Sequence, residues 1–525
     1  MPTRRGPRRL LAAFLGTAVA VIGLGTYLTA SGQPEASAAV VAGNLPVNRG
    51  ATDPDDLSAN NSPTLVVNPT RATTLAVVNR VDSPAYSCAL HLSYDGGSTW
   101  AEKAIPFPAG EEAPPRCFAP DAAFGPDGTL YITFVTLAGA GNVPNAAWIV
   151  SSADGRAAFT EPVRITGPRA FQVRLLVDPR SPGRLNVSWL QAADVAIFAF
   201  PATGNPIVST VSSDGGATWS EPVRVSPPSR ARVVAPVPAF GDGTLYVAYL
   251  DVGDDRLDYA GAHGGEGGEP YDGTWSVVVA RSTDGRRWEE AVVDAGVVPA
   301  ERFIAFLPPT PSVAFDAGRK RLYVAFQDAR SGDADVSLWI SGDGGRTFGG
   351  PTKVNDDGRA GTAQYLPKLA VAPDGRLDVL YFDRRADLAN KRNEVSLQSS
   401  FDGGRSFRHR LRVSDGSFDT RIGYGQDRGL PDLGSRLGLV STDHRALAVW
   451  TDTRSARPIL AEQDLARAVV AFSPASSLRG LLRGVGAALL AVGLLVSLLA
   501  LVLPARRAST RLRTPVDNAV DEQIM

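Results

Sequence analysis

Short runs of β-branched and aromatic residues, separated by polar turn residues, alternate along most of the chain. The unit 310–355 contains four such runs, each bounded by Gly, Asp or Arg. They occupy residues 312–315, 322–326, 336–340 and about 352–354. Runs of this length and composition are typical of β-strands. Because no stretch between Leu45 and Phe472 shows the periodicity of an amphipathic helix, the pattern predicts an all-β body.

One segment recurs through this body in six copies, which we call the repeat boxes. The clearest copies are SYDGGSTW, SSDGGATW, SGDGGRTF and SFDGGRSF, and the looser ones are SADGRAAF and STDGRRW. Their aspartates are Asp95, Asp154, Asp214, Asp284, Asp343 and Asp402. Successive aspartates are 59, 60, 70, 59 and 59 residues apart, and a fixed period of this size indicates a repeat architecture.

Four strands in each 60-residue unit predict a β-propeller. Residues 61–472 hold about seven units, and the last, 433–472, lacks a repeat box. We expect seven four-stranded blades, with the N-terminal segment 39–60 closing the ring by pairing, near residues 41–48, with the last blade. A six-bladed ring with extra terminal strands is the alternative.

Each repeat box is predicted to be a structural turn between the third and fourth strands. The glycines supply the positive φ angles of a tight hairpin, and the aspartate accepts hydrogen bonds from backbone N–H groups. The terminal Trp or Phe packs between blades. The six aspartates are therefore assigned to folding and not to catalysis.

The Ser-x-Asp-x-Gly-x-Thr-Trp pattern resembles the Asp box, or BNR repeat, of the sialidase (neuraminidase) superfamily over roughly residues 60–472. The chain is most similar to exported bacterial sialidase-like proteins. The resemblance implies a propeller, and in sialidases three arginines, a Tyr–Glu pair and an Asp perform the chemistry. The Phe/Tyr-Arg-Ile-Pro marker of the first arginine is absent, and AFQVRLL (170–176) and PVRITGP (162–168) are the nearest fragments. We therefore transfer no catalytic residue, and the catalytic residues stay unknown.

A second motif, aromatic-x-Asp-x-Arg, recurs at the end of the second strand in FQDARSG, YFDRRAD and WTDTRSA. The turn that follows lies on the face opposite the repeat boxes, where the substrate pocket of sialidases opens. In one interpretation these arginines surround a funnel and bind a carboxylate, sulfate or phosphate. In the other, which recurrence favours, each Asp caps its turn and pairs with its own Arg. The candidate residues are Arg330, Arg385, Arg454, Asp328, Asp383 and Asp452.

Two loops carry further candidates. Tyr424, in RIGYGQDRG, is the best nucleophile if the protein is an enzyme, and an ordinary loop tyrosine otherwise. The Gly-rich acidic stretch 251–275 offers oxygen ligands for Ca²⁺, but its spacing matches no EF-hand, so a solvated loop is favoured. Four histidines without paired spacing predict no zinc site. We expect no cofactor.

The two ends of the chain predict export and a membrane anchor. Arginines followed by an apolar run make residues 1–38 a signal peptide, either cleaved or retained as an anchor. After a linker at 473–483, the 20 uncharged residues 484–503 match the length of a transmembrane helix. Arginines in the tail 504–525 place this tail in the cytoplasm and the propeller outside the cell.

Cysteine content and charge complete the picture. Cys88 and Cys117 are the only cysteines, and an exported pair is expected to form a disulfide. A formal net charge of −1 gives no reason to expect nucleic acid as a partner. The sequence thus predicts a single-pass, membrane-anchored extracellular propeller that binds a glycan or cell-surface protein without catalysis. An exo-α-sialidase with a divergent active site and a cell-envelope scaffold are the alternatives.

Overall fold

The structure is a computed structural model, and it describes most of the chain. The described residues are 16–27, 37–41, 43–48, 58–110, 116–139, 141–194, 202–255, 257, 271–300, 309–358, 361–423, 425–426, 432–455, 461–473 and 484–499. They fall into two compact units: Ala39–Ala471 is one, and Met1–Ala38 with Phe472–Met525 is the other. Each unit is treated by itself below.

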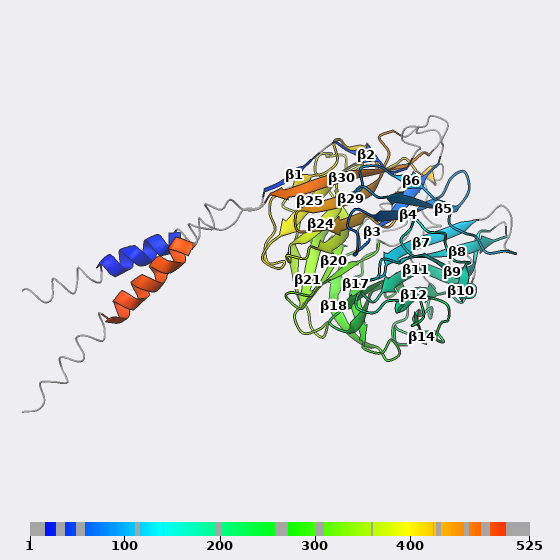
Figure 1. The fold of residues 1–525 in the computed structure, drawn as a ribbon, viewed down its shortest axis with the longest axis horizontal. Coiled ribbons are helices and arrows are strands. Elements are labelled where there is room, and N and C mark those ends of the chain that lie inside the picture. The colour runs from blue at the N-terminus through cyan, green and yellow to red at the C-terminus, as the bar shows by residue number, and fades with distance from the viewer. Residues whose placement is uncertain are drawn as a thin grey trace, which may run out of the picture. The chain divides into compact units, whose positions relative to one another are not determined.

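The larger unit is a seven-bladed β-propeller of antiparallel sheets, numbered here as blades 1 to 7 in chain order (Figure 1). In blades 1 to 6 the strands follow the chain from the innermost to the outermost. Blade 1 is β3 (Asn60–Val67), β4 (Leu75–Val81), β5 (Ser87–Ser93) and β6 (Ala101–Glu102). Blade 2 is β7 (Cys117–Phe124), β8 (Leu130–Ala138), β9 (Val143–Ser152) and β10 (Val163–Thr166). Blade 3 is β11 (Ala170–Val177), β12 (Leu185–Gln191), β13 (Ile207–Ser212) and β14 (Val223–Arg224).

The remaining blades repeat this order. Blade 4 is β15 (Val233–Gly241), β16 (Thr244–Asp251), β17 (Trp275–Ser282) and β18 (Glu289–Val297). Blade 5 is β19 (Ser312–Asp316), β20 (Arg321–Asp328), β21 (Asp335–Ser341) and β22 (Gly349–Lys353). Blade 6 is β23 (Gln364–Val371), β24 (Leu377–Asp383), β25 (Arg392–Ser400) and β26 (Leu411–Arg412), with β27 (Phe418–Asp419) also paired to β25. The four strands predicted within 310–355 thus correspond to the four strands of blade 5.

Blade 7 closes the ring with both ends of the propeller. Its strands β28 (Gly438–Ser441), β29 (Arg445–Asp452) and β30 (Asp464–Ser473) are joined by β1 (Ser37–Val40), while β2 (Leu45–Pro46) also pairs with β30. Figure 1 shows β1, in blue, beside β30, in orange. The innermost strands contact one another in the order β3, β7, β11, β15, β19, β23, β28 and back to β3. Seven blades are confirmed, and the six-bladed alternative is wrong. Of the two pairing segments, β2 lies within the predicted 41–48, whereas β1 lies before it and begins inside the predicted signal peptide.

Apolar contacts between neighbouring blades form the core. Innermost and second strands are buried on both sides, so they carry almost continuous apolar runs rather than a simple alternation. Trp189, Trp339 and Trp450 are fully buried on second or third strands, as are Tyr249 and Tyr381. Packing at this density fixes the positions of the innermost strands and of the side chains that they present to the axis.

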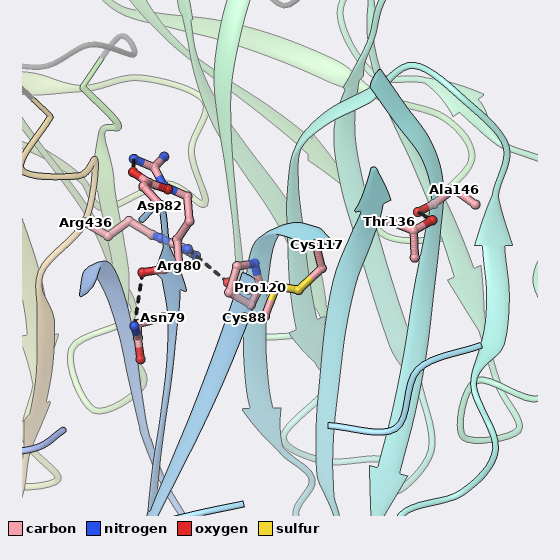
Figure 2. The surroundings of a disulfide bond; sticks show 9 residues. All are labelled: Asn79, Arg80, Asp82, Cys88, Cys117, Pro120, Thr136, Ala146 and Arg436. Atoms are coloured by element: carbon pink, nitrogen blue, oxygen red, sulfur yellow. Dashed lines mark hydrogen bonds and ion pairs between the residues drawn. A yellow bond between two sulfur atoms is a disulfide. The ribbon is translucent and has the colours of Figure 1, made fainter. Parts of the chain in front are cut away.

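The predicted disulfide joins blades 1 and 2. Cys88 lies in β5 and Cys117 in β7, with their Cα atoms 5.8 Å apart (Figure 2). The two residues are 29 positions apart in the chain. The bond therefore connects the third strand of one blade to the innermost strand of the next, and the prediction of this pair is confirmed.

Among the described residues of the smaller unit there are two helices, residues 16–27 and 484–499. They pack closely where glycine permits it: a Cβ on Gly25 would lie 2.8 Å from the backbone N of Leu490, and one on Gly493 would lie 2.6 Å from a side-chain atom of Ile22. Within the described part of the chain, no helix combines the length and the apolar character needed to cross a bilayer. The end of the predicted transmembrane segment, residues 500–503, lies outside the described residues.

Candidate functional site

The aspartates of the repeat boxes hydrogen-bond within their own turns. Asp214 accepts hydrogen bonds from the backbone N of Thr218 at 3.0 Å and from the hydroxyl of Ser212 at 2.8 Å. Hydrogen bonds from Thr218 and Ser212 lower the pKa of Asp214 to about 2. Gly216 has a φ of +90°, which only glycine adopts readily. These contacts keep the carboxylate charged and turned toward its own backbone.

Neighbouring blades hold the repeat boxes from outside. Arg467 of blade 7 donates to the carbonyl of Ser98 in blade 1 at 3.0 Å, and Lys103 of blade 1 donates to the carbonyl of Gly155 in blade 2 at 2.7 Å. Arg321 of blade 5 makes the same kind of contact in blade 6. A basic side chain of one blade thus stabilises the box turn of the next, which is a structural use of the repeat.

The aromatic-x-Asp-x-Arg motif forms capped and paired turns. The backbone N of Arg385 donates to Asp383 at 3.0 Å, and its guanidinium lies 2.7 Å from the same carboxylate. Arg454 makes the same two contacts with Asp452, at 2.9 and 2.6 Å. These contacts are those of the interpretation in which each Asp caps its turn and pairs with its own Arg. Ligand binding by these residues remains a prediction.

The third copy of the motif has the same arrangement with an added partner. Arg330 pairs with Asp328 through both its backbone N and its guanidinium, and it also lies 2.8 Å from Asp294. None of the six motif residues lines the axial cavity described below.

The loop candidates fall largely outside the described residues. Tyr424 is one of these, as are residues 258–270 of the acidic stretch. In the described part of that stretch, Asp254 accepts a hydrogen bond from Tyr271, and Asp255 accepts one from the indole of Trp275 at 3.0 Å. The nucleophile and calcium interpretations therefore stay predictions.

A cavity of about 180 Å³ lies on the axis of the propeller. All seven blades contribute to its wall, through residues near the middle of the innermost strand in blades 1, 2, 3, 4 and 6 and at or just before its beginning in blades 5 and 7. We call it the axial channel. Its polar and charged wall residues are Thr64, Asp121, Arg174, Thr310, Ser312, Lys368, Ser435 and Arg436. None of them was predicted from the sequence to have a role.

A backbone irregularity recurs in five innermost strands beside the channel. In each, one non-glycine residue has a φ between 50° and 59°, and the pairing register shifts around it. The residue two positions later faces the cavity. The five pairs are Ser62 and Thr64, Ala119 and Asp121, Gln172 and Arg174, Ala235 and Val237, and Leu366 and Lys368. A β-bulge of this kind redirects a side chain.

The sequence does carry a signal for these positions. In blades 1, 2, 4, 5 and 6 the channel residue is the last of an x-Pro-x triplet, and blade 3 has Val173 in place of the proline. The triplets are Ser62–Thr64, Ala119–Asp121, Ala235–Val237, Thr310–Ser312 and Leu366–Lys368. Proline inside a predicted inner strand, repeated at the blade period, would have marked the bulges.

Three cations and one carboxylate meet on the channel wall. Arg174 is only 8 % exposed, and Lys368 is partly exposed, with its side chain on the cavity wall. In the described part of the chain, neither side chain has a hydrogen bond or an ion pair. Arg436 donates to the carbonyl of Pro120 at 2.9 Å (Figure 2). It also donates to the hydroxyl of Thr64 at 2.9 Å.

Asp121 is the single carboxylate among the described residues of the wall. It accepts hydrogen bonds from the hydroxyl of Thr64 at 2.9 Å and the backbone N of Leu175 at 3.0 Å. Its distance to the guanidinium of Arg436 is 3.4 Å. The carboxylate is therefore already engaged by several donors, and the channel keeps an excess of positive charge.

Burial and mutual repulsion act on these cations. Burial, reinforced by the charge of Arg174, lowers the pKa of Lys368 to about 8 and that of Arg436 to about 9. Burial also lowers the pKa of Arg174, while the charge of Asp121 opposes this change. Burial and repulsion thus disfavour the charged forms of these side chains.

Lys368 lies near the middle of its strand, between the end beside the repeat box and the end at Gln364, which pairs with Asp383 on the opposite face. In blade 6, Lys368 pairs with Leu380 inside the sheet, whereas the box follows Ser400, which pairs with Leu377 at the start of β24. Val371, at the end of β23, also pairs with Leu377. Lys368 is thus three residues, or about 10 Å, along the strand from the box end.

Comparisons with known proteins give no family. No protein-family model and no curated protein matches the chain. A Dyadobacter fermentans protein of unknown function is 13% identical, with a TM-score of 0.46, over 83% of this chain and 99% of that one. A Hadza microbial sialidase is 14% identical, with a TM-score of 0.43, over 81% of this chain and 68% of that one. An α-L-arabinofuranosidase of Fusarium graminearum is 15% identical, with a TM-score of 0.41, over 69% and 95%. Similarity at this level assigns no activity.

Proposed function

We propose that this protein is an extracellular, membrane-anchored propeller that binds an acidic group of a glycan or cell-surface protein without hydrolysing it. The observation that supports this is the charge of the axial channel: Arg174, Lys368 and Arg436 share its wall with one carboxylate. Guanidinium and ammonium groups are the usual partners of carboxylate, sulfate and phosphate. At about 180 Å³, the cavity suits one acidic group better than a chain of sugars.

In this proposal the six repeat boxes are Asp boxes of the sialidase superfamily, and they build the blades rather than bind the ligand. The hydrogen bonds of Asp214 within its own turn support this assignment. The ligand enters from the opposite face, where the aromatic-x-Asp-x-Arg turns lie.

The proposed location is the cell surface. Residues 1–38 direct export, residues 484–503 anchor the chain, and the tail 504–525 lies in the cytoplasm. The Cys88–Cys117 disulfide is consistent with an oxidising compartment. Protease treatment of intact cells tests the topology: we expect loss of the propeller and protection of an epitope tag on the tail.

Hydrolysis by a sialidase mechanism would require a Tyr–Glu pair beside the cations. Among the described residues of the cavity wall there is no Tyr or Glu. Tyr249 does donate to Glu290 at 2.6 Å, but neither residue lines the cavity, and Arg230 lies 3.0 Å from the same glutamate. The pair is therefore explained by local ion pairing in blade 4.

A binding panel and a turnover assay together test the proposal. The purified full chain in detergent would be offered acidic and neutral glycans, and separately a fluorogenic sialoside. We expect binding of acidic glycans alone, reduced by Arg174→Met, with no turnover. Equal binding of neutral glycans would contradict the proposal, and turnover that is lost in Arg174→Met would show an enzyme instead.

A further inference from the structure

The channel cations come from blades on different parts of the ring. Arg174 belongs to blade 3 and Lys368 to blade 6, while Arg436 precedes the innermost strand of blade 7. An anion that contacts all three would therefore connect blades that share no strand pairing. Such a ligand would stabilise the closed ring in addition to being the group that the protein recognises.

The protein itself supplies too little negative charge for this channel. Asp121 is 3.4 Å from Arg436 and is also occupied by Thr64 and Leu175, so it neutralises one of three cations at most. Arg174, although more than nine-tenths buried, has no hydrogen-bond partner among the described residues. Burying a charge without a partner is unfavourable, so these cations lower the stability of the folded ring unless an anion pairs with them.

We infer that the axial channel binds one small inorganic oxyanion, sulfate or phosphate, as a structural counter-ion that joins blades 3, 6 and 7 across the axis. Several acceptor oxygens suit donors that arrive from three directions, and a halide offers no such geometry. The inference goes beyond recognition, because it concerns the stability of the ring whether or not a glycan is bound. The acid group of a ligand would occupy the same place and displace the free anion.

Mass action gives the expected effect. An anion that binds only the folded chain raises the midpoint of thermal unfolding by about 3 °C when it is at a hundredfold excess over its Kd. The full chain in detergent would be melted in an oxyanion-free buffer, with sodium sulfate added against sodium chloride of equal ionic strength. We expect a saturable rise with sulfate. General salting-out by sulfate grows steadily with concentration instead.

Two substitutions separate a specific site from a merely structural role. Lys368→Met removes a charge and leaves no described residue without a hydrogen-bond partner. We therefore expect a higher midpoint of thermal unfolding in the absence of sulfate. We also expect the affinity for sulfate to be weakened at least about tenfold. Arg174→Met provides the same test if the first variant fails to fold. Lys320→Met is the matched control, because this lysine is 72% exposed and lies 3.4 Å from Asp242, away from the cavity.

The outcomes are distinct. A non-saturable rise, or the same saturable rise in the wild type and in both channel variants, overturns the inference. If sulfate saturates the channel but the glycan panel is negative, the recognition proposal fails and the counter-ion inference stands. If acidic glycans bind through Arg174 but free sulfate and phosphate have no saturable effect, the counter-ion inference fails and the recognition proposal stands. Competition between sulfate and a bound acidic glycan distinguishes the two sources of the anion.

Discussion

The guanidinium of Arg436 lies 3.4 Å from the carboxylate of Asp121, although 315 positions separate them in the chain. Asp121 belongs to blade 2 and Arg436 to the entry of blade 7, so they meet only because the ring closes. Arg436 also donates to the carbonyl of Pro120, next to the carboxylate that it faces. The contact ties the charge of the channel to ring closure, and it leaves Arg174 and Lys368 without a carboxylate of their own.

A second buried ion cluster near this contact is expected to be a major determinant of stability. Arg80 is 2.6 Å from Asp82 and also contacts Asp432, and all three side chains are almost fully buried. Arg80→Met would leave two buried carboxylates without a cation, so we expect a loss of about 3–5 kcal/mol in the free energy of unfolding. Urea denaturation measures this change.

The exposed pair of Arg421 and Asp419 provides the control for that experiment. The side chain of Arg421 is 61% exposed, so Arg421→Met should cost less than about 1 kcal/mol. A small loss for Arg80→Met, close to that of the control, would show that the buried carboxylates are protonated or solvated instead.

The disulfide is expected to stabilise the junction of blades 1 and 2. Cys88 and Cys117 close a loop of 29 positions, so replacing both with Ala should cost about 3 kcal/mol. Denaturation of the wild type with and without reductant measures the same quantity, and the double variant should be insensitive to reductant. Equal midpoints for all of these samples would be inconsistent with a bond that constrains the unfolded chain.

The repeat boxes are expected to affect stability but not recognition. Asp402 accepts hydrogen bonds from the hydroxyl of Ser400 at 2.8 Å and the backbone N of Ser406 at 3.0 Å. Asp402→Ala should therefore cost about 1 kcal/mol, as the loss of a capping side chain usually does. Glu221→Ala, at an exposed position without a left-handed backbone conformation, is the control. Loss of acidic-glycan binding in a folded Asp402→Ala variant would contradict our assignment of the boxes.

The stability of the anion-free protein should rise at alkaline pH because of Lys368. Its pKa lies at about 8 in the folded chain, against an ordinary 10.5, so between these values the unfolded chain binds more protons. The stability therefore increases from about pH 8 to pH 10.5, and the charge penalty is fully present below pH 8. The difference in unfolding free energy between wild type and Lys368→Met measures this group alone, and a difference independent of pH would refute it.

Local patterns made the fold largely predictable, since each blade repeats the same signals. The repeat boxes gave the period, and the apolar runs of 310–355 matched β19 to β22 because strand composition and turn residues agree there. A closing segment near 41–48 was expected because the last unit lacks a box, and β2 lies there, whereas β1 begins inside the residues predicted as the signal peptide. The partner of Cys88 followed from there being only one other cysteine.

The channel was not predicted, because its residues do not repeat in kind. Thr64, Asp121, Arg174 and Lys368 occupy corresponding places in different blades but differ in chemistry, so no motif search finds them. Their common feature is a backbone bulge, for which the prolines at 63, 120 and 367 are the local signal. The aromatic-x-Asp-x-Arg motif repeated more clearly, and its arginines turned out to be occupied by their own aspartates.

The most direct measurement is a crystal structure of the protein grown in selenate, an anomalous scatterer that mimics sulfate. We expect one strong anomalous peak on the propeller axis, within hydrogen-bond distance of Arg174, Lys368 and Arg436, and its loss in Lys368→Met crystals. An axis without a peak at saturating selenate, or a peak that persists unchanged in the variant, would contradict the assignment of the axial channel as the anion-binding site.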